Sequence, residues 1–173
     1  LEGKFDVDGN KIILNKDAIY TDAEIVSATE TSIEMVSGVV TDLRTMYIEN
    51  AKMDPIYKTS LLDRIYLNGG EFNAVSDFDL NSDKTLFMLG NNIYRKDASF
   101  SQHGTGDWNL AHLSHGGSDS INANATFEST GTGFIHPTST FTDDYKGNIY
   151  VNSGNIVFGN NNGAVRLSGN AKQ

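Results

Sequence analysis

The feature that most limits the fold of this chain is a series of short segments in which apolar and polar residues alternate, separated by glycine and asparagine. The segments RIYLNGGEFNAVSDFDLN and KTLFMLGNNIYRKDASF alternate in this way, and their cuts fall at Asn68-Gly69-Gly70 and at Gly90-Asn91-Asn92. Alternation with a period of two is typical of a β-strand, and glycine and asparagine accept the backbone angles of tight turns. The pattern predicts short strands that meander antiparallel to one another.

The composition of the 173-residue chain supports β-structure and disfavours several kinds of partner. The chain has 17 Gly, 2 Pro, no Cys and a formal net charge of -9. An acidic chain with scattered Lys and Arg disfavours nucleic acid and anionic membrane surfaces as partners. The lack of Cys excludes disulfides and thiolate metal sites. No apolar run approaches the roughly 18 residues that a membrane span needs, so we expect no membrane insertion.

The N-terminal part contains a turn signal and a seven-residue period. Asp8-Gly9 suits a two-residue hairpin turn, because both residues accept positive φ. In the segment 21–54, apolar residues recur at the a and d spacing of a coiled coil. They are Val26, Ile33, Val36, Val40, Leu43 and Tyr47. The alternative is that this stretch, rich in β-branched residues, forms several short strands of a fibrous β-structure.

Two of the four histidines stand close together in HLSHGGSDSI, residues 112–121. His112 and His115 are three apart and can lie on one side of a turn, with His103 and Asp119 completing a shell of nitrogen and oxygen ligands. The spacing matches no specific metal signature, and the glycine pair also suits a simple turn. These four residues are the candidate metal site, the identity of the ion is open, and no other cofactor is expected.

The patterns that carry catalysis are weak. Ser114, His115 and Asp119 have the residue types of a hydrolase triad, but the Gly-x-Ser-x-Gly turn is absent and sequence neighbours rarely have triad geometry. The adjacent Asp143 and Asp144 would point to opposite faces of a strand, whereas a glycosidase needs two carboxylates that converge. We therefore expect a binding protein rather than an enzyme.

Aromatic residues set among Asn, Asp and Gly give the second half of the chain the composition of a carbohydrate-binding surface. Aromatic faces stack on sugar rings, while amides and carboxylates bond the hydroxyls. The alternative is that these aromatics belong to the core. The candidate ligand-binding residues are Trp108, Asp107, Tyr145, Asp143, Asp144, Asn122 and Asn124, and further candidate aromatics are Phe134, Phe141 and Tyr150.

The histidine segment resembles a short His-x-x-x-His-x-x-Gly-Gly-x-Asp-x-Ile element of bacteriophage tail fibre and tailspike proteins. The residues that carry the resemblance are His112, His115, Gly116, Gly117, Asp119 and Ile121. Here the histidines are one residue closer together, and the two residues before Gly-Gly are missing. The resemblance implies an intertwined homotrimer on the virion tail, acting outside cells beside other tail or baseplate proteins and recognising a bacterial surface glycan.

Together these patterns predict a mainly β, elongated fibrous homotrimer. Residues 1–58 would form a stalk, coiled-coil or β, and residues 59–173 a β-rich receptor-binding head that is sandwich-like or barrel-like. A quasi-repeat of Gly-Asn-Ile at 147–151 and 154–157 suits such strands. The expected function is host adsorption through a surface glycan. The alternatives are a depolymerase that cleaves a surface polysaccharide or teichoic acid, a trimerisation or chaperone domain, and a bacterial adhesin.

Overall fold

A computed structural model describes most of the chain. The described residues are 2–14, 18–21, 23–27, 31–35, 45–49, 51–53, 56–58, 64–110, 117–138, 141–159 and 164–168. In these ranges every regular element is a β-strand, and no helix is long and apolar enough to cross a membrane. The prediction of a mainly β chain is therefore confirmed.

The strands form four sheets, which we call A to D. Sheet A contains β1 (Gly3–Asp6), β4 (Ala23–Val26), β7 (Lys52–Met53), β10 (Glu71–Phe72), β13 (Ile93–Tyr94), β16 (Ser120–Ile121), β19 (Thr142–Tyr145) and β21 (Ala164–Leu167). Sheet B contains β2 (Ile12–Leu14), β5 (Ser32–Met35), β8 (Ile56–Lys58), β11 (Ser76–Leu80), β14 (Ala98–Gln102), β17 (Ala125–Ser129) and β20 (Ile149–Ser153). Sheet C contains β3 (Ala18–Thr21), β6 (Thr45–Glu49) and β9 (Arg64–Asn68), and sheet D contains β12 (Leu86–Phe87), β15 (Trp108–Asn109) and β18 (Ile135–His136).

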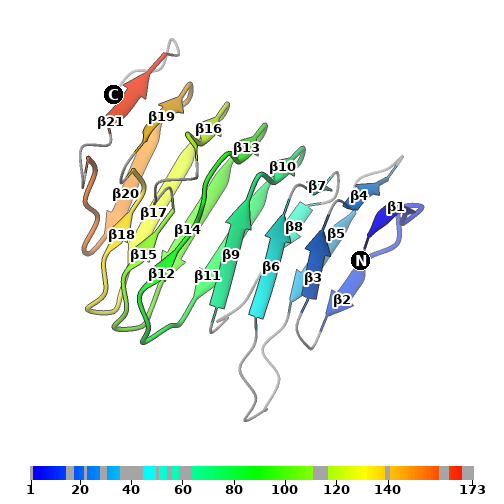
Figure 1. Cartoon of the computed structure of the whole chain (residues 1–173), viewed down its shortest axis with the longest axis horizontal. Coiled ribbons are helices and arrows are strands. Elements are labelled where there is room, and N and C mark those ends of the chain that lie inside the picture. Colours follow the sequence, from blue (N-terminus) through cyan, green and yellow to red (C-terminus); the bar gives the residue numbers. More distant parts are fainter. Residues whose placement is uncertain are drawn as a thin grey trace.

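The chain winds as a parallel β-solenoid, a stack of coils in which a complete turn adds one strand to sheet A, one to sheet B and one to either sheet C or sheet D. Every pairing among the described strands is parallel, and each strand pairs with its counterpart in the next coil. The coils contain different numbers of residues. Lys52 pairs with Glu71 in the following coil and with Glu24 in the preceding one, and the second pair lies farther apart in the sequence. Figure 1 shows the coils stacked from the N-terminal end to the C-terminal end of the molecule.

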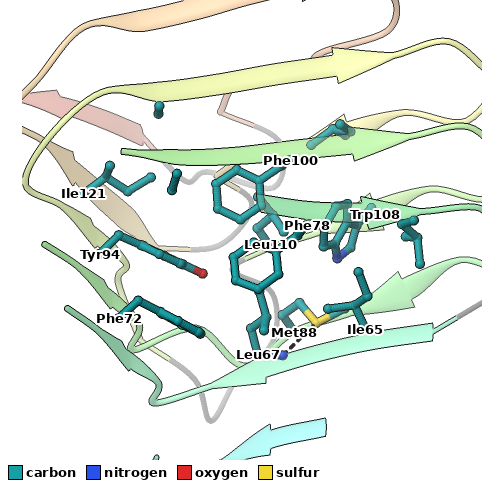
Figure 2. Close-up of a cluster of buried hydrophobic side chains, with 14 of the residues drawn as sticks. Ile65, Leu67, Phe72, Phe78, Met88, Tyr94, Phe100, Trp108, Leu110 and Ile121 are labelled. Carbon is teal, nitrogen blue, oxygen red and sulfur yellow. Dashed lines mark hydrogen bonds between the residues drawn. The ribbon is translucent and has the colours of Figure 1, made fainter. Parts of the chain in front are cut away.

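The alternation in the sequence decides which side chains enter the core. On β11, β14 and β17 the first, third and fifth residues are buried and the two between them are partly exposed. Because in-register pairing places equivalent residues of successive coils side by side, like side chains stack inside the solenoid. The rings of Phe78, Phe100 and Phe127 stack at centroid distances of 5.5 and 5.4 Å. Figure 2 shows Phe78 and Phe100 in the buried cluster beside Tyr94 and Trp108.

Glycines allow the loops between sheets B and D to stack as closely as the strands do. A Cβ atom at Gly104 would lie 2.1 Å from the carbonyl oxygen of Ser82, and one at Gly131 would lie 2.0 Å from the carbonyl oxygen of Gly104. No real Cβ atom tolerates such a contact, so the loops of successive coils need glycine at these positions for steric reasons.

Parallel pairing corrects three predictions about how the strands are arranged. The antiparallel meander and the sandwich-like or barrel-like head are wrong, because parallel strands joined by wide coils replace hairpins. Asp8 and Gly9 do have positive φ, 48° and 72°, as predicted. The hairpin itself is wrong, since β1 and β2 belong to different sheets.

The coiled-coil interpretation of residues 21–54 is also wrong for the described residues, and the short strands of the β alternative are confirmed, whereas its fibrous form stays a prediction. The described parts of this segment are strands, and Ile33, an expected a position, is buried inside the chain's own solenoid. Val36, Val40 and Leu43 lie outside the described residues. Strands on both sides of residue 58 belong to the same sheets. The division into a stalk and a head, and the trimer, stay predictions.

Candidate functional site

The outer surface of sheet B is a broad polar face. We call it the polar face and define it by seven residues at outward positions of β11, β14, β17 and β20, which are Asp77, Asp79, Ser99, Ser101, Thr126, Glu128 and Tyr150. The register places them in two columns that run across successive coils. On β11, β14 and β17 each outward side chain carries a hydroxyl or a carboxylate. Such a face offers donors and acceptors at each coil spacing, about 4.8 Å apart.

One column of the polar face combines an aromatic ring with hydrogen-bonding groups. It runs Asp77, Ser99, Thr126, Tyr150. The Ser99 hydroxyl donates to Asp77 Oδ1 at 2.6 Å. Tyr150 is 48% exposed, so its ring surface is accessible from solvent. An exposed ring beside hydroxyls and a carboxylate has the chemistry that binds a polyhydroxylated ligand.

At the edge of the polar face, three side chains from three successive coils come together. His103 Nε2 lies 2.7 Å from Asp79 Oδ1, and His103 Nδ1 lies 2.5 Å from Thr130 Oγ1. The backbone ladder continues beyond the strands to hold them there: the His103 N–H donates to the Leu80 carbonyl, and the Thr130 N–H donates to the Gln102 carbonyl. The side chains of His103 and Asp79 are 30% and 26% exposed.

The corner that leads into sheet A holds a buried polar ladder. Asp119 Oδ1 accepts hydrogen bonds from the backbone N–H and the side-chain Nδ2 of Asn92, at 2.8 and 3.1 Å. The Asp119 N–H in turn donates to Asp143 Oδ1 at 2.7 Å. Asp143 Oδ2 is buried and has no hydrogen-bond partner in the described part of the chain. Each polar side chain therefore fastens its own coil to the next.

Burial controls the protonation of this ladder. Desolvation raises the pKa of Asp119 well above the usual range of a carboxyl group, against the hydrogen bonds from Asn92. Desolvation also raises the pKa of Asp143, and the negative charge of Asp119 raises it further. The two carboxyl groups therefore disfavour each other's ionisation, and the folded pair retains a proton where an exposed aspartate would lose it.

Three of the predicted ligand-binding residues are core residues. Trp108 and Tyr145 are 0% and 2% exposed, and their rings pack against Phe100 and Phe127 respectively. Asp143 is 0% exposed. The strand alternation turns these three side chains inward, so none of them is accessible to a ligand at the surface, and for the two aromatics the core alternative holds.

The other predicted ligand-binding residues lie at the surface, where they bridge coils. Asp107 Oδ1 accepts from the Phe134 N–H. Asn122 Oδ1 accepts from Lys146 Nζ, and Asn124 Oδ1 accepts from the Asn148 N–H. Asp144 lies on the outer face of β19, where it accepts hydrogen bonds from Arg166 and Ser168. These residues hold the surface of the solenoid together and form no common site with the polar face.

The two predicted metal ligands that the structure describes, His103 and Asp119, are not brought together. His103 stands after β14 and contacts Asp79, whereas Asp119 stands before β16 and contacts Asn92, so the two occupy different corners of the coil. His112 and His115 lie outside the described residues. Within the described ranges no three His, Asp or Glu side chains converge as a metal site would require. We assign Asp119 to the buried ladder and not to a metal site.

Sequence reasoning missed Asp79 and Thr130, although a repeat points to the second. Phe-x-x-x-Gly-Thr-Gly occurs at residues 100–106 and again at 127–133, and its fourth position is His103 in one copy and Thr130 in the other. Comparisons with protein-family models, curated proteins and solved structures return no match. The resemblance to phage tail fibres therefore stays a prediction from the sequence.

Proposed function

We propose that this chain is a receptor-recognition protein of the bacteriophage tail-fibre kind, and that its polar face binds a bacterial surface glycan. The observation that carries the proposal is the column Asp77, Ser99, Thr126 and Tyr150, in which an exposed ring continues a row of hydroxyl and carboxylate groups. A linear glycan that lies across the coils would meet one such group per coil.

The charge of the polar face favours a neutral glycan over an acidic one. Asp77, Asp79 and Glu128 contribute carboxylates, while β11, β14, β17 and β20 contain no Lys or Arg, and the neighbouring strand β8 adds one cation, Lys58, in register with Asp77. The whole chain is also acidic, with a formal net charge of -9. An acidic polysaccharide would be repelled from such a surface, most strongly at low ionic strength.

Glycan binding is tested with the full chain, using host surface polysaccharides and isothermal titration calorimetry. Tyr150→Ala should weaken binding by up to about tenfold, because an aromatic contact contributes about 0.5–1.5 kcal/mol. Phe134→Ala is the matched control, since Phe134 is 39% exposed but lies before β18, away from the polar face. Equal losses in both variants, or no binding by the wild-type chain, would rule out the polar face as the receptor site.

Assembly into a trimer is a separate part of this proposal. The expected apolar stalk no longer calls for a partner, because Ile25 and Ile33 are already buried in the chain's own core. Only the resemblance to tail fibres supports the trimer. Light scattering of the intact protein tests it, and multivalent attachment through several copies would turn weak single-site affinity into firm adhesion.

A further inference from the structure

The Asp79, His103 and Thr130 contacts join the three kinds of group that activate a hydroxyl nucleophile. The imidazole lies between a carboxylate and a hydroxyl, with one ring nitrogen toward each. Asp79 Oδ1 lies at ion-pair distance from Nε2, and in the tautomer that carries its proton on Nε2 the lone pair of Nδ1 faces the Thr130 hydroxyl. A nucleophile within reach of a base, which is itself oriented by a third group, is the arrangement of hydroxyl-based hydrolases.

Thr130 and His103 are accessible to a substrate from solvent. Thr130 is exposed, directly after β17, and His103 is only partly covered. The three residues come from successive coils, so their spacing is fixed by the strand pairing of β11, β14 and β17 and not by a loop alone. We propose that Thr130, His103 and Asp79 act as nucleophile, general base and positioning residue in the hydrolysis of acyl esters.

The reaction proceeds in two steps, acylation of Thr130 and hydrolysis of the acyl-Thr130. Thr130 Oγ1 bonds to the ester carbonyl carbon as its proton passes to His103 Nδ1; the bond from that carbon to the alkoxy oxygen then breaks, and the proton leaves with the alcohol. Water next attacks the acyl-Thr130 carbonyl carbon and gives a proton to His103 Nδ1. The bond between that carbon and Thr130 Oγ1 breaks, Oγ1 takes the proton, and a carboxylic acid is released. Asp79 orients the imidazole and stabilises its positive charge, and no metal or redox partner is required.

The natural substrate follows from the position of these residues. Asp79 belongs to the polar face, and Thr130 lies two residues beyond Glu128 of the same face. An O-acylated glycan bound across the coils would place an ester near Thr130. This choice of substrate rests on the proposed glycan binding, whereas the ester chemistry itself does not.

The test uses the full chain and p-nitrophenyl acetate, a small ester that needs no glycan site. We expect the wild-type protein to release p-nitrophenol and Thr130→Val and His103→Ala to lower kcat/KM by about 100-fold or more, as loss of acid–base catalysis does. Thr130→Ser should retain activity, and Thr132→Ala, an exposed neighbour outside the polar face, serves as the control. Mass spectrometry of the wild-type protein should detect an acetyl group on the peptide that contains Thr130.

The outcomes separate this inference from the proposed function. Hydrolysis that persists in Thr130→Val, or a wild-type rate no higher than that of Thr130→Val, overturns the inference. Each variant is first compared with wild type in thermal denaturation, and the acetyl adduct decides the matter if Thr130→Val does not fold. Ester hydrolysis without glycan binding would remove the proposed function and keep the inference. Acetate release from acetylated xylan then tests the glycan ester directly.

Discussion

Asp143 and Asp144 are neighbours on β19, yet they belong to two different regions of the molecule. Asp143 points inward, where its carboxylate accepts the Asp119 N–H of the preceding coil and burial raises its pKa. Asp144 points outward, where hydrogen bonds from Arg166 and Ser168 lower its pKa. The difference shows that the role of a residue in this solenoid depends on which side of the strand it occupies. The inner side joins coils within the core, and the outer side is available for chemistry.

The largest difference in stability between an inward and an outward substitution should appear at the stack of aromatic rings. Phe100→Ala removes a ring that is 1% exposed and packs against other rings, so it should cost about 3–5 kcal/mol in the free energy of unfolding. Ser99→Ala changes the outward neighbour and should cost below about 1 kcal/mol, the contribution of a single hydrogen bond. Urea denaturation measures both. Similar losses in the two variants would contradict the assignment of inner and outer faces.

The stacked loops should give the next largest effect. Gly133→Ala places a Cβ atom 2.1 Å from the Gly106 carbonyl oxygen, and this overpacking should cost about 1–3 kcal/mol. Thr132→Ala, at the exposed position beside it, should stay within about 0.5 kcal/mol of wild type. Thermal denaturation compares the two, and a wild-type midpoint for Gly133→Ala would show that the loops do not stack closely.

The buried ladder predicts a dependence of stability on pH. The folded pKa values of Asp119 and Asp143 are raised above the unfolded value of about 4, so from that pH upward the folded state binds more protons than the unfolded state. The free energy of unfolding should therefore fall as pH rises into the neutral and alkaline range, by up to about 1.4 kcal/mol per pH unit for each retained proton. Urea denaturation across this range measures the slope.

Asp143→Asn tests whether the buried ladder causes this dependence of stability on pH. The amide oxygen can still accept the Asp119 N–H, but the side chain no longer titrates, so the slope of stability against pH should become shallower. A slope equal to that of wild type would show that the ladder carries no retained proton.

The smallest effect is expected on the outer side of the same strand. Asp144→Asn removes an exposed ion pair with Arg166, and exposed pairs contribute little to stability. The sign of its pH dependence is opposite to that of Asp143. A lowered pKa stabilises the fold above the ordinary aspartate range, and this stabilisation is lost as pH falls through the lowered value. Acid denaturation should therefore begin at a slightly higher pH in Asp144→Asn, and a shift to lower pH would contradict this.

The sequence predicts local conformation in this chain better than it predicts pairing. The positive φ of Asp8 and Gly9 follows from the residue types alone, and so does the alternation along β11. The partner of each strand does not follow, because parallel partners lie one coil away and the coils vary in length. The seven-residue apolar period in residues 21–54 resembles that of a helix, although Val26, Ile33 and Tyr47 lie in strands, since β-branched residues serve both patterns.

The candidate sites show the same limit. Asp79, His103 and Thr130 are far apart in the sequence and meet only because their coils stack. The repeated Phe-x-x-x-Gly-Thr-Gly is the signal that would have aligned two of these coils, because its glycines are required where loops touch. The sequence leaves open whether Trp108 and Tyr145 face a ligand or the core, because the neighbours of a strand residue do not show the direction in which its side chain points, and the structure buries both.

The stacking of coils also determines how this protein responds to tension. Figure 1 places the N- and C-terminal ends at opposite ends of the stack, and strands pair only with those of adjacent coils. A force that pulls the two ends apart would detach terminal coils one after another, because no bond of the sheets spans more than one coil. Each release would lengthen the chain by the residues between partners such as Lys52 and Glu71, roughly 65 Å at about 3.4 Å per residue. The molecule would thus unfold in steps under force and dissipate mechanical work at each step, while the remaining coils stay folded.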